Sequence, residues 1–520
     1  MLLTALVGLG VARDALGVAM RLPNVLQNLL GEGSLSASFI PVYSRLVADR
    51  ETQRAGRLAG AVLTLLVTAV AVFVLVVFAF TRPLVDLMTF YGLGDARLDL
   101  AVSLTRITTL GIAFLVPSAW CLGILNSHRQ FFLSYVAPVV WNIAQIVVLV
   151  AVVLVGVTDE GAVKAVAWAV VVGGFLQFAV QYPSVRRAVP ALRISFGRGS
   201  GAVRDVVSKF GHAVVGRGAA QISSFVDLGL AALLATGAIG ALLVAQVLYL
   251  LPISLFAMSI AAAELPELST TDDTEQFSER LLDGSRRSAF FVLFTAGAYV
   301  SLGDWIIASL YQRGDFTADD TLVVWTILAA FAVALPATAS SRVLQAALFA
   351  LGDAKGPSRI AIVRVLISAA VGVVVMFSLD RVTVVGREFR DLSDAIGLFG
   401  PLEASVRSAE GAPIRLGAAG LAIGAAVASW VEMLLLRRYL VRHHRSIRPP
   451  RGVAGPLAVP LALSFVVAAF LKLVLQPLPV IVAAVLALGV SGFVYTVAAF
   501  RNGVAESQLV LRPIRRVLYR

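Results

Sequence analysis

The sequence has few of the residues on which soluble enzymes rely. Cys121 is the single cysteine among 520 residues, and the four histidines include the adjacent pair His443 and His444. One cysteine cannot form an intrachain disulfide, and no Cys/His spacing is typical of a metal site. No nucleophile, base and orienting residue form a catalytic pattern, so we predict that the chain is not an enzyme and uses no cofactor or metal.

Charge is also scarce. Only 14% of the residues are charged, 59% are hydrophobic and the mean hydropathy is +0.88, whereas soluble proteins are about 25% charged. No polar stretch is long enough to fold as a separate domain, so the composition predicts one polytopic membrane unit. The net charge of +12 comes from Lys and Arg in short loops beside apolar segments. That placement indicates membrane topology rather than binding to nucleic acid.

Apolar runs long enough to cross a membrane recur along the chain. Together with a helix from Asp14 to Pro41, they predict an all-α protein with about thirteen transmembrane helices. The other twelve lie near residues 58–81, 100–125, 132–156, 162–183, 205–235, 239–263, 288–311, 320–351, 358–379, 415–438, 456–476 and 479–500.

The basic residues predict the orientation of these helices. Lys and Arg concentrate in every second loop, beginning with the loop at 44–57. The positive-inside rule assigns these loops to the cytoplasm and predicts a cytoplasmic C-terminus. Two stretches depart from the pattern. The acidic stretch 264–283 is interpreted as a solvated surface helix between two halves of the fold, and the polar stretch 380–414 as a flexible outer insertion or a contact for an outer partner.

The N-terminal span carries polar residues at helical spacing. Asp14, Arg21 and Asn28 are seven residues apart in turn, which places them on one stripe of a helix. An ionisable side chain at membrane depth costs at least about 2.5 to 3.5 kcal/mol, so we expect this stripe to face a watery cavity or a protein partner. Pro23 removes a backbone donor within the same run. The pattern therefore predicts a broken helix that lines a central cavity.

Several motifs in this chain occur in the same order in a known family. The motif G-x-G-x-A-x-D-A-x-x-V-A-x-R-L-P-N, from Gly8 to Asn24, and E-G-S-L-S-A-S-F-I-P, from Glu32 to Pro41, resemble the second transmembrane helix of the MurJ (MviN) family. Further similar segments are G-I-L-N-S-H-R-Q-F at 123–131, L-Y-Q-R-G-D-F-T-A-D-D at 310–320 and A-L-G-D-A-K-G-P-S-R-I-A at 350–361. The family consists of lipid II flippases of the multidrug/oligosaccharidyl-lipid/polysaccharide superfamily.

The resemblance implies a fold of two six-helix lobes around a central cavity, with two further C-terminal helices. Mapped onto this chain, residues 1–200 form the N-terminal lobe, 201–445 the C-terminal lobe, and 446–520 the two added helices with a basic cytoplasmic tail. Relatives begin with a full helix before the first motif, and residues 1–10 are too short to be one. We expect a start codon assigned too far downstream, the alternative being a naturally shortened protein.

We expect the cavity to be lined by Arg21, Asp14, Arg217, Arg342, Asn24, Gln27 and Glu32. The resemblance implies most of these positions, but the family does not usually have a cation at the position of Arg217. Arg21 matches a basic position of the family and is interpreted as a phosphate contact, with a structural pair to Asp14 as the alternative. Asp14 is expected to orient an arginine. Arg342 lies inside an apolar span, and Arg217 lies between two glycines in another. Glu32 is expected either to gate the cavity or to cap a half-helix.

The chain departs from the family pattern at several positions, and three expected cationic contributions are missing. Two of these departures are at single residues. Gln27 stands where relatives have a cavity arginine, and Gly372 stands near the position of a polar residue that some relatives use for cation binding. The first departure removes an expected cation from the cavity, and the second argues against sodium coupling.

The function that follows is translocation of lipid II by alternating access across a bacterial inner membrane. The alternatives are a flippase for another glycan on a polyprenyl pyrophosphate, and a membrane scaffold for envelope synthesis that does not transport. Expected partners are the lipid-linked precursor, membrane lipids and proteins of cell-wall synthesis, but not nucleic acid.

Overall fold

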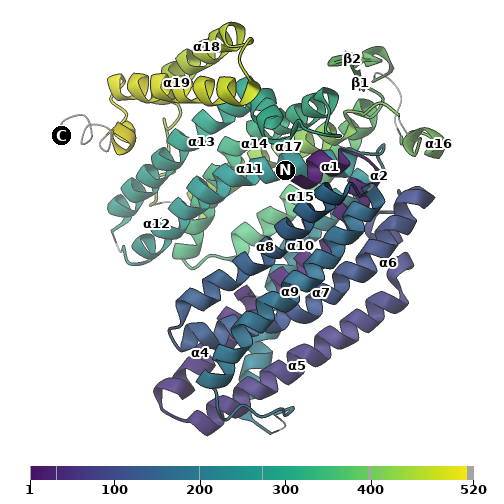
Figure 1. The fold of residues 1–520 in the computed structure, drawn as a ribbon. Coiled ribbons are helices and arrows are strands. Elements are labelled where there is room, and N and C mark those ends of the chain that lie inside the picture. The colour runs from purple at the N-terminus through teal and green to yellow at the C-terminus, as the bar shows by residue number, and fades with distance from the viewer. Residues whose placement is uncertain are drawn as a thin grey trace, which may run out of the picture. The chain divides into compact units, whose positions relative to one another are not determined.

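The computed structural model describes residues 2–511, except residues 31, 158, 198, 272, 396–399, 410–411 and 445. Its contacts divide the chain into two compact units, a first unit at Leu2–Leu233 and a second unit at Leu234–Arg520. Both consist almost entirely of helices (Figure 1). Each unit is described by itself below.

The first unit contains ten helices among the described residues: α1 (Leu2–Val7), α2 (Val11–Ala19), α3 (Arg21–Leu30), α4 (Glu32–Ala48), α5 (Thr52–Ala79), α6 (Thr81–Met88), α7 (Asp95–Ser127), α8 (Phe131–Val155), α9 (Asp159–Ala188) and α10 (Gly201–Ala232). Helix α7 packs against α5 on one side and against α9 on another. Helix α7 is therefore the central and most buried helix of this unit.

The N-terminal membrane helix is broken, as the sequence predicts. Helix α2 ends at Ala19 and α3 begins at Arg21, so Pro23 lies in the first turn of α3, where a missing N–H is tolerated. Pro23 cannot donate a hydrogen bond to the carbonyl of Ala19, four residues earlier. The hydroxyl of Thr108 on α7 donates to that oxygen instead, at 3.0 Å. A neighbouring hydroxyl that satisfies a freed carbonyl allows proline within a membrane helix.

The core of the first unit explains where the unit ends. Trp120 of α7 is fully buried, and its indole N–H donates to the carbonyl of Ala59 on α5 at 3.1 Å. Val203 and Val206 at the start of α10 pack into the same apolar core. Helix α10 therefore belongs to the first unit, and the contacts divide the chain after Leu233. The lobe boundary between residues 200 and 201 stays a prediction.

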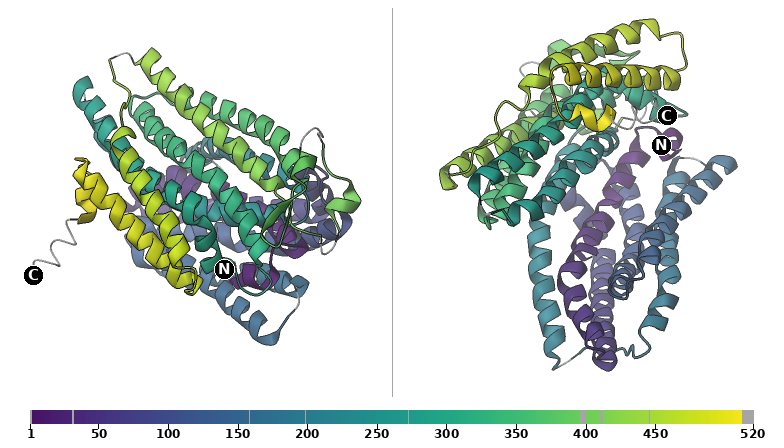
Figure 2. Two further views of the ribbon diagram at one scale, coloured as in Figure 1. Left: turned by 90° about the horizontal axis from the view of Figure 1, so that it is seen from above. Right: turned by 90° about the vertical axis from the view of Figure 1, so that its left-hand side faces the viewer.

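The second unit contains α11 (Ala238–Pro252), the π-helix η1 (Ile253–Met258), α12 (Ser259–Ser269), α13 (Thr274–Tyr311), α14 (Ala318–Ala350), α15 (Lys355–Leu379), β1 (Thr383–Val385), β2 (Glu388–Arg390), η2 (Leu392–Ala395), α16 (Ala404–Arg407), α17 (Gly417–His443), η3 (Gly455–Leu457), α18 (Ala458–Val474) and α19 (Val480–Arg501). Helix α17 packs between α14 and α15, and α18 lies beside α19 and α13 (Figure 2).

The motif at 350–361 has a structural explanation in this unit. Asp353 precedes α15, and its carboxylate accepts a hydrogen bond from the N–H of Gly356 at 3.0 Å. This bond stabilises the ionised form and lowers the pKa of Asp353. A Cβ at Gly356 would lie 2.4 Å from the ring of Tyr439. The motif therefore starts α15 and lets it approach α17 closely.

Within the described residues, eleven helices are long and apolar enough to cross a membrane. They correspond to eleven of the thirteen predicted spans. The two other predictions are the N-terminal span, which is divided into α2, α3 and α4, and the span at 205–235, which falls on α10. Of α10, Ser223–Ala232 is recognised as a shorter apolar helix.

The two unusual stretches have different outcomes. The prediction of one surface helix at 264–283 is wrong, because α12 ends at Ser269 and α13 begins at Thr274. Apart from residue 272, which lies outside the described residues, the acidic residues lie in the last turns of α12 or from the N-cap of α13 onward. The described part of 380–414 contains an antiparallel hairpin, in which Val384 of β1 pairs with Phe389 of β2.

Candidate functional site

Charged side chains inside membrane helices are costly, so they mark candidate functional positions. The first such group is an ion pair between α2 and α7. Asp14 is 0% exposed and Arg97 is 1% exposed, and Oδ2 of Asp14 lies 3.4 Å from Nη1 of Arg97. Asp14 thus contacts an arginine, as the sequence predicts, but this arginine is not one of the predicted cavity residues.

Arg97 was missed because it lies at the start of a span, where a loop charge is common. The guanidinium group is incompletely satisfied. Its Nε and Nη2 atoms have no hydrogen-bond partner in the described part of the chain. The ion pair between Asp14 and Arg97 is therefore buried and strongly desolvated. Loss of either side chain would leave the charge of the other uncompensated.

Arg21 contacts α10 rather than α2. Its Nη2 atom donates a hydrogen bond to the carbonyl of Ser224. Asp227, one turn further along α10, interacts with Arg21 electrostatically. The side chain of Arg21 is half-buried. Asp14 pairs with Arg97 and Arg21 contacts α10, so Arg21 does not form the structural pair with Asp14. The other interpretation of Arg21, a phosphate contact, stays a prediction.

The remaining predicted residues of the first unit lie on three helices. Asn24 and Gln27 follow Arg21 at intervals of three residues along α3, and both side chains are exposed. Glu32 is the first residue of α4, and Arg217 lies in α10. The side chains of Glu32 and Arg217 lie outside the described residues, so their proposed roles stay predictions.

The second unit holds a polar network around Arg342 on α14. Nη1 of Arg342 donates to Oε1 of Gln345 at 3.1 Å, and Nε2 of Gln345 donates to Oε1 of Glu432 at 3.0 Å. Glu432 lies on α17, and its Oε2 is 3.8 Å from Nε of Arg364 on α15. Three helices thus meet through one carboxylate, which is 4% exposed.

The network extends toward α11. One turn before Arg342, the hydroxyl of Thr338 forms a hydrogen bond with the hydroxyl of Tyr249 at 2.9 Å. Tyr249 also lies within electrostatic range of Arg342, Arg364 and Glu432. The charged part contains two arginines and one carboxylate, which leaves one positive charge in excess. Nε of Arg342 has no hydrogen-bond partner within the described residues.

Sequence reasoning found Arg342 but missed Glu432, Arg364 and Gln345. The signal was present, because Arg364 and Glu432 are ionisable residues inside the predicted spans 358–379 and 415–438. Both residues lie closer to a predicted loop than Arg342 does. They therefore resemble the charged residues that commonly flank the ends of membrane helices. Among the described residues, no three His, Cys, Asp or Glu side chains gather as a metal-binding group.

Comparisons with known proteins agree on a family. The family model described as "Lipid II flippase MurJ" matches residues 3–385. A protein of Bdellovibrio bacteriovorus, described as "Probable lipid II flippase MurJ", is 31% identical over 372 residues, which cover 70% of this chain and 70% of the relative.

Two solved structures share the fold. One is described as "Lipid II flippase MurJ, inward closed conformation", with a TM-score of 0.73 and 20% identity over 99% of this chain and 95% of that chain. The other is an inward-facing multidrug resistance MATE family transporter of the MOP superfamily, with a TM-score of 0.65 and 15% identity over 86% of this chain and 93% of that chain. The predicted fold class, an all-α polytopic membrane protein, is confirmed.

Proposed function

This chain belongs to the MurJ family of lipid II flippases, and from that membership we propose that it moves lipid II from the inner to the outer leaflet of the bacterial cytoplasmic membrane. Lipid II carries a pyrophosphate, a disaccharide and a peptide on a polyprenyl tail. Its polar head group cannot cross hydrocarbon unaided. The protein must therefore supply polar and cationic contacts at membrane depth.

The observation that carries this proposal is the arginine network of the second unit. Arg342 and Arg364 share the single carboxylate of Glu432, and Nε of Arg342 has no hydrogen-bond partner among the described residues. An arginine can donate two parallel hydrogen bonds to phosphate oxygens. A pyrophosphate would neutralise the excess positive charge and accept from the unused donor. Glu432 positions the arginines while the substrate is absent.

Arg21 is the corresponding cation of the first unit. Its guanidinium group contacts Ser224 and Asp227 of α10, and the exposed side chains of Asn24 and Gln27 follow it on α3. We assign Asp14 to a supporting role, because its buried pair with Arg97 fixes α2 on α7. Glu32 is proposed as a further cavity residue on the family resemblance, and Arg217 is proposed because glycines on both sides of it allow a close approach of the backbone.

Translocation is proposed to follow alternating access. Two compact units are suited to rock against each other, as the repeats of other transporters do. A C-terminus in the cytoplasm and partners among the proteins of cell-wall synthesis complete the proposal. In this mechanism the protein makes and breaks only non-covalent contacts with its substrate.

Complementation tests the proposal directly. In a bacterial strain depleted of its own lipid II flippase, the wild-type chain is expected to restore growth, whereas a chain with Arg21→Ala and Arg342→Ala is expected to fail. Removing a charge-assisted hydrogen bond costs about 1.5–3 kcal/mol, so each single variant is expected to weaken binding of lipid II by at least about tenfold.

Arg359→Ala is the matched control, because Arg359 is an exposed arginine of α15 outside the network. It is expected to grow as the wild type does. Equal amounts of all variants in the membrane must be shown by immunoblotting. Full rescue by the double variant would reject these arginines as substrate contacts. Preferential binding of a lipid-linked head group without the peptide would reject lipid II as the substrate.

A further inference from the structure

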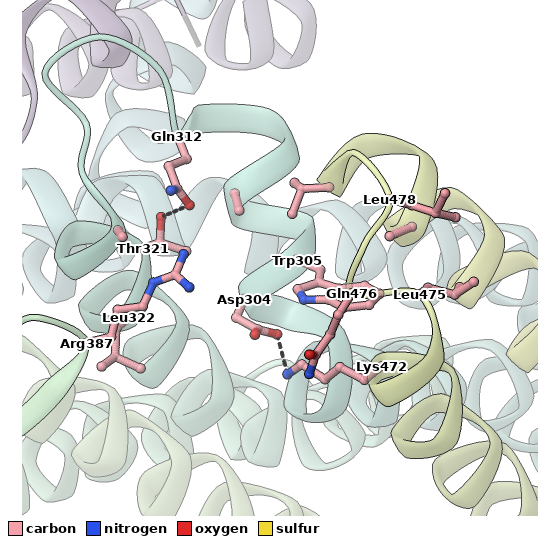
Figure 3. Close-up of a pocket in the computed structure, with 14 residues that line it drawn as sticks. Asp304, Trp305, Gln312, Thr321, Leu322, Arg387, Lys472, Leu475, Gln476 and Leu478 are labelled. Atoms are coloured by element: carbon pink, nitrogen blue, oxygen red, sulfur yellow. Dashed lines mark hydrogen bonds and ion pairs between the residues drawn. The ribbon is translucent and has the colours of Figure 1, made fainter.

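A pocket lies within the second unit and shares no lining residue with the arginine network. Its volume is about 520 Å³, and it is enclosed by α13, α14, the turn between β1 and β2, and the connection from α18 to α19 (Figure 3). This volume lies in the range of about 300–1,000 Å³ that is typical of ligand pockets. Its polar lining consists of Gln312, Thr321 and Arg387 on one wall and Asp304, Lys472 and Gln476 on the other.

Lys472 is held in place by three contacts. Its Nζ atom lies 2.8 Å from Oδ1 of Asp304, donates to the carbonyl of Ser301 at 3.3 Å, and is 5.6 Å from the centre of the Trp325 ring. An ammonium group has three N–H donors, of which these partners use two. Both members of the ion pair remain close to 30% exposed, at 30% for Lys472 and 28% for Asp304. One donor of Lys472 is therefore available to a ligand.

Arg387 supplies the second cation. It lies in the turn between β1 and β2, and its backbone N–H donates to Oδ1 of Asp319 at 2.7 Å, while that of Gly386 donates to Oδ2 at 3.0 Å. Asp319 thus anchors the turn on the first turn of α14. The guanidinium group has no hydrogen-bond or ion-pair partner among the described residues, and Figure 3 shows it beside Thr321.

The chemistry of the lining selects a ligand class. Two cations and one carboxylate leave an excess positive charge, which favours a phosphate. The amides of Gln312 and Gln476 and the hydroxyl of Thr321 can bind hydroxyl groups. Leu475, Leu478 and Val480, at the α18–α19 connection, form an apolar part of the lining, which we call the apolar rim.

The surface next to the pocket favours a membrane lipid. On α18, Phe470 is 62% exposed and Leu473 is 71% exposed, as expected for side chains that contact acyl chains. We propose that this pocket binds the head group of an anionic phospholipid. The phosphate lies between Arg387 and Lys472, and the hydroxylated alcohol lies against Gln312, Thr321 and Gln476. A soluble saccharide would use the amides but would need neither the excess charge nor the apolar rim.

Native mass spectrometry of the purified full chain tests this site without a transport assay. The delipidated protein is titrated with dioleoyl phosphatidylglycerol or with dioleoyl phosphatidylcholine, which differ only in the head group. The wild type is expected to bind the phosphatidylglycerol about tenfold more tightly. Arg387→Gln is expected to abolish this preference, a loss of about tenfold or about 1.4 kcal/mol. Gln476→Ala is expected to weaken it by about threefold.

Arg390→Gln is the matched control, because Arg390 is an exposed arginine of the same hairpin that does not line the pocket. It is expected to keep the wild-type preference. If the wild type, Arg387→Gln and Arg390→Gln all showed the same preference for phosphatidylglycerol over phosphatidylcholine, the proposal would be overturned. Tighter binding of diacetylchitobiose than of phosphatidylglycerol would also overturn the proposal, because it would identify a saccharide site. Binding of free glycerol phosphate as tightly as the lipid would remove the role of the apolar rim and also contradict the proposal.

Discussion

At the residue scale, the buried charges of this protein depend on partners that are distant in sequence. Asp14 and Arg97 are separated by 83 positions and lie on different helices. Glu432 is likewise paired with Arg364 from another helix. In each case a side chain that would be costly in hydrocarbon is retained because a second element supplies the opposite charge.

A double-mutant cycle on Asp14 and Arg97 measures this dependence. Asp14→Ala alone or Arg97→Ala alone leaves one buried charge without its partner, and each is expected to lower the free energy of unfolding by about 3–5 kcal/mol. The double variant is expected to lose less than the sum of the two. The measurement is reversible unfolding in detergent, followed by Trp fluorescence. Strictly additive losses would contradict a direct interaction between the two side chains.

Sequence reasoning singled out individual charged residues but not the residues that pair with them. Asp14 and Arg342 were found because each interrupts an apolar run. Arg97 and Glu432 were not, because Arg97 precedes the predicted start of the span at 100–125 and Glu432 lies near the predicted end of the span at 415–438. Helical periodicity relates residues on one helix, but it carries no information about which residue on another helix completes a pair.

At the element scale, the broken N-terminal helix was predictable and its repair was not. Pro23 signals the break from the sequence. Thr108, which donates to the freed carbonyl of Ala19, comes from α7. The wrong prediction at 264–283 has a similar cause, because a run of acidic residues indicates exposure to solvent but does not distinguish one helix from two helix ends.

Removing the hydroxyl of Thr108 tests the repair. Thr108→Val keeps the shape of the side chain but leaves the carbonyl of Ala19 without this donor. Hydrogen bonds between membrane helices contribute about 0.6–2 kcal/mol, so a destabilisation of this size is expected from chemical unfolding in detergent. Thr108→Ser keeps the hydroxyl and should remain within about 0.5 kcal/mol of the wild type, as neutral substitutions do. Equal stability of both variants would show that another group satisfies Ala19.

At the scale of the whole molecule, hydropathy predicted the order of the spans well. Eleven of the predicted spans recur as long apolar helices among the described residues. The contact boundary at Leu233 was not predictable, because it depends on the packing of Val203 and Val206 rather than on a change in composition. The orientation of the chain in the membrane remains a prediction from its loop charges.

Cysteine labelling can determine that orientation with little interference, because the only native cysteine, Cys121, is fully buried. Asp315→Cys lies in the connection from α13 to α14, and Ala454→Cys lies between α17 and α18. In intact spheroplasts, a membrane-impermeant maleimide is expected to label position 315 and to leave position 454 unlabelled until the membrane is permeabilised. The wild type is the unlabelled control, and the reverse pattern would place the C-terminus outside.

The π-helix η1 (Ile253–Met258) adds one residue to a turn in the middle of a long span. One added residue rotates every later side chain by about 100° around the helix axis. Helix α11, before the insertion, packs on α14 and α17, whereas α12, after it, packs on α14 and α13. A single inserted residue thereby lets one continuous membrane helix contact different neighbours before and after η1. Deleting that residue would turn the face of α12 that contacts α13 away from α13.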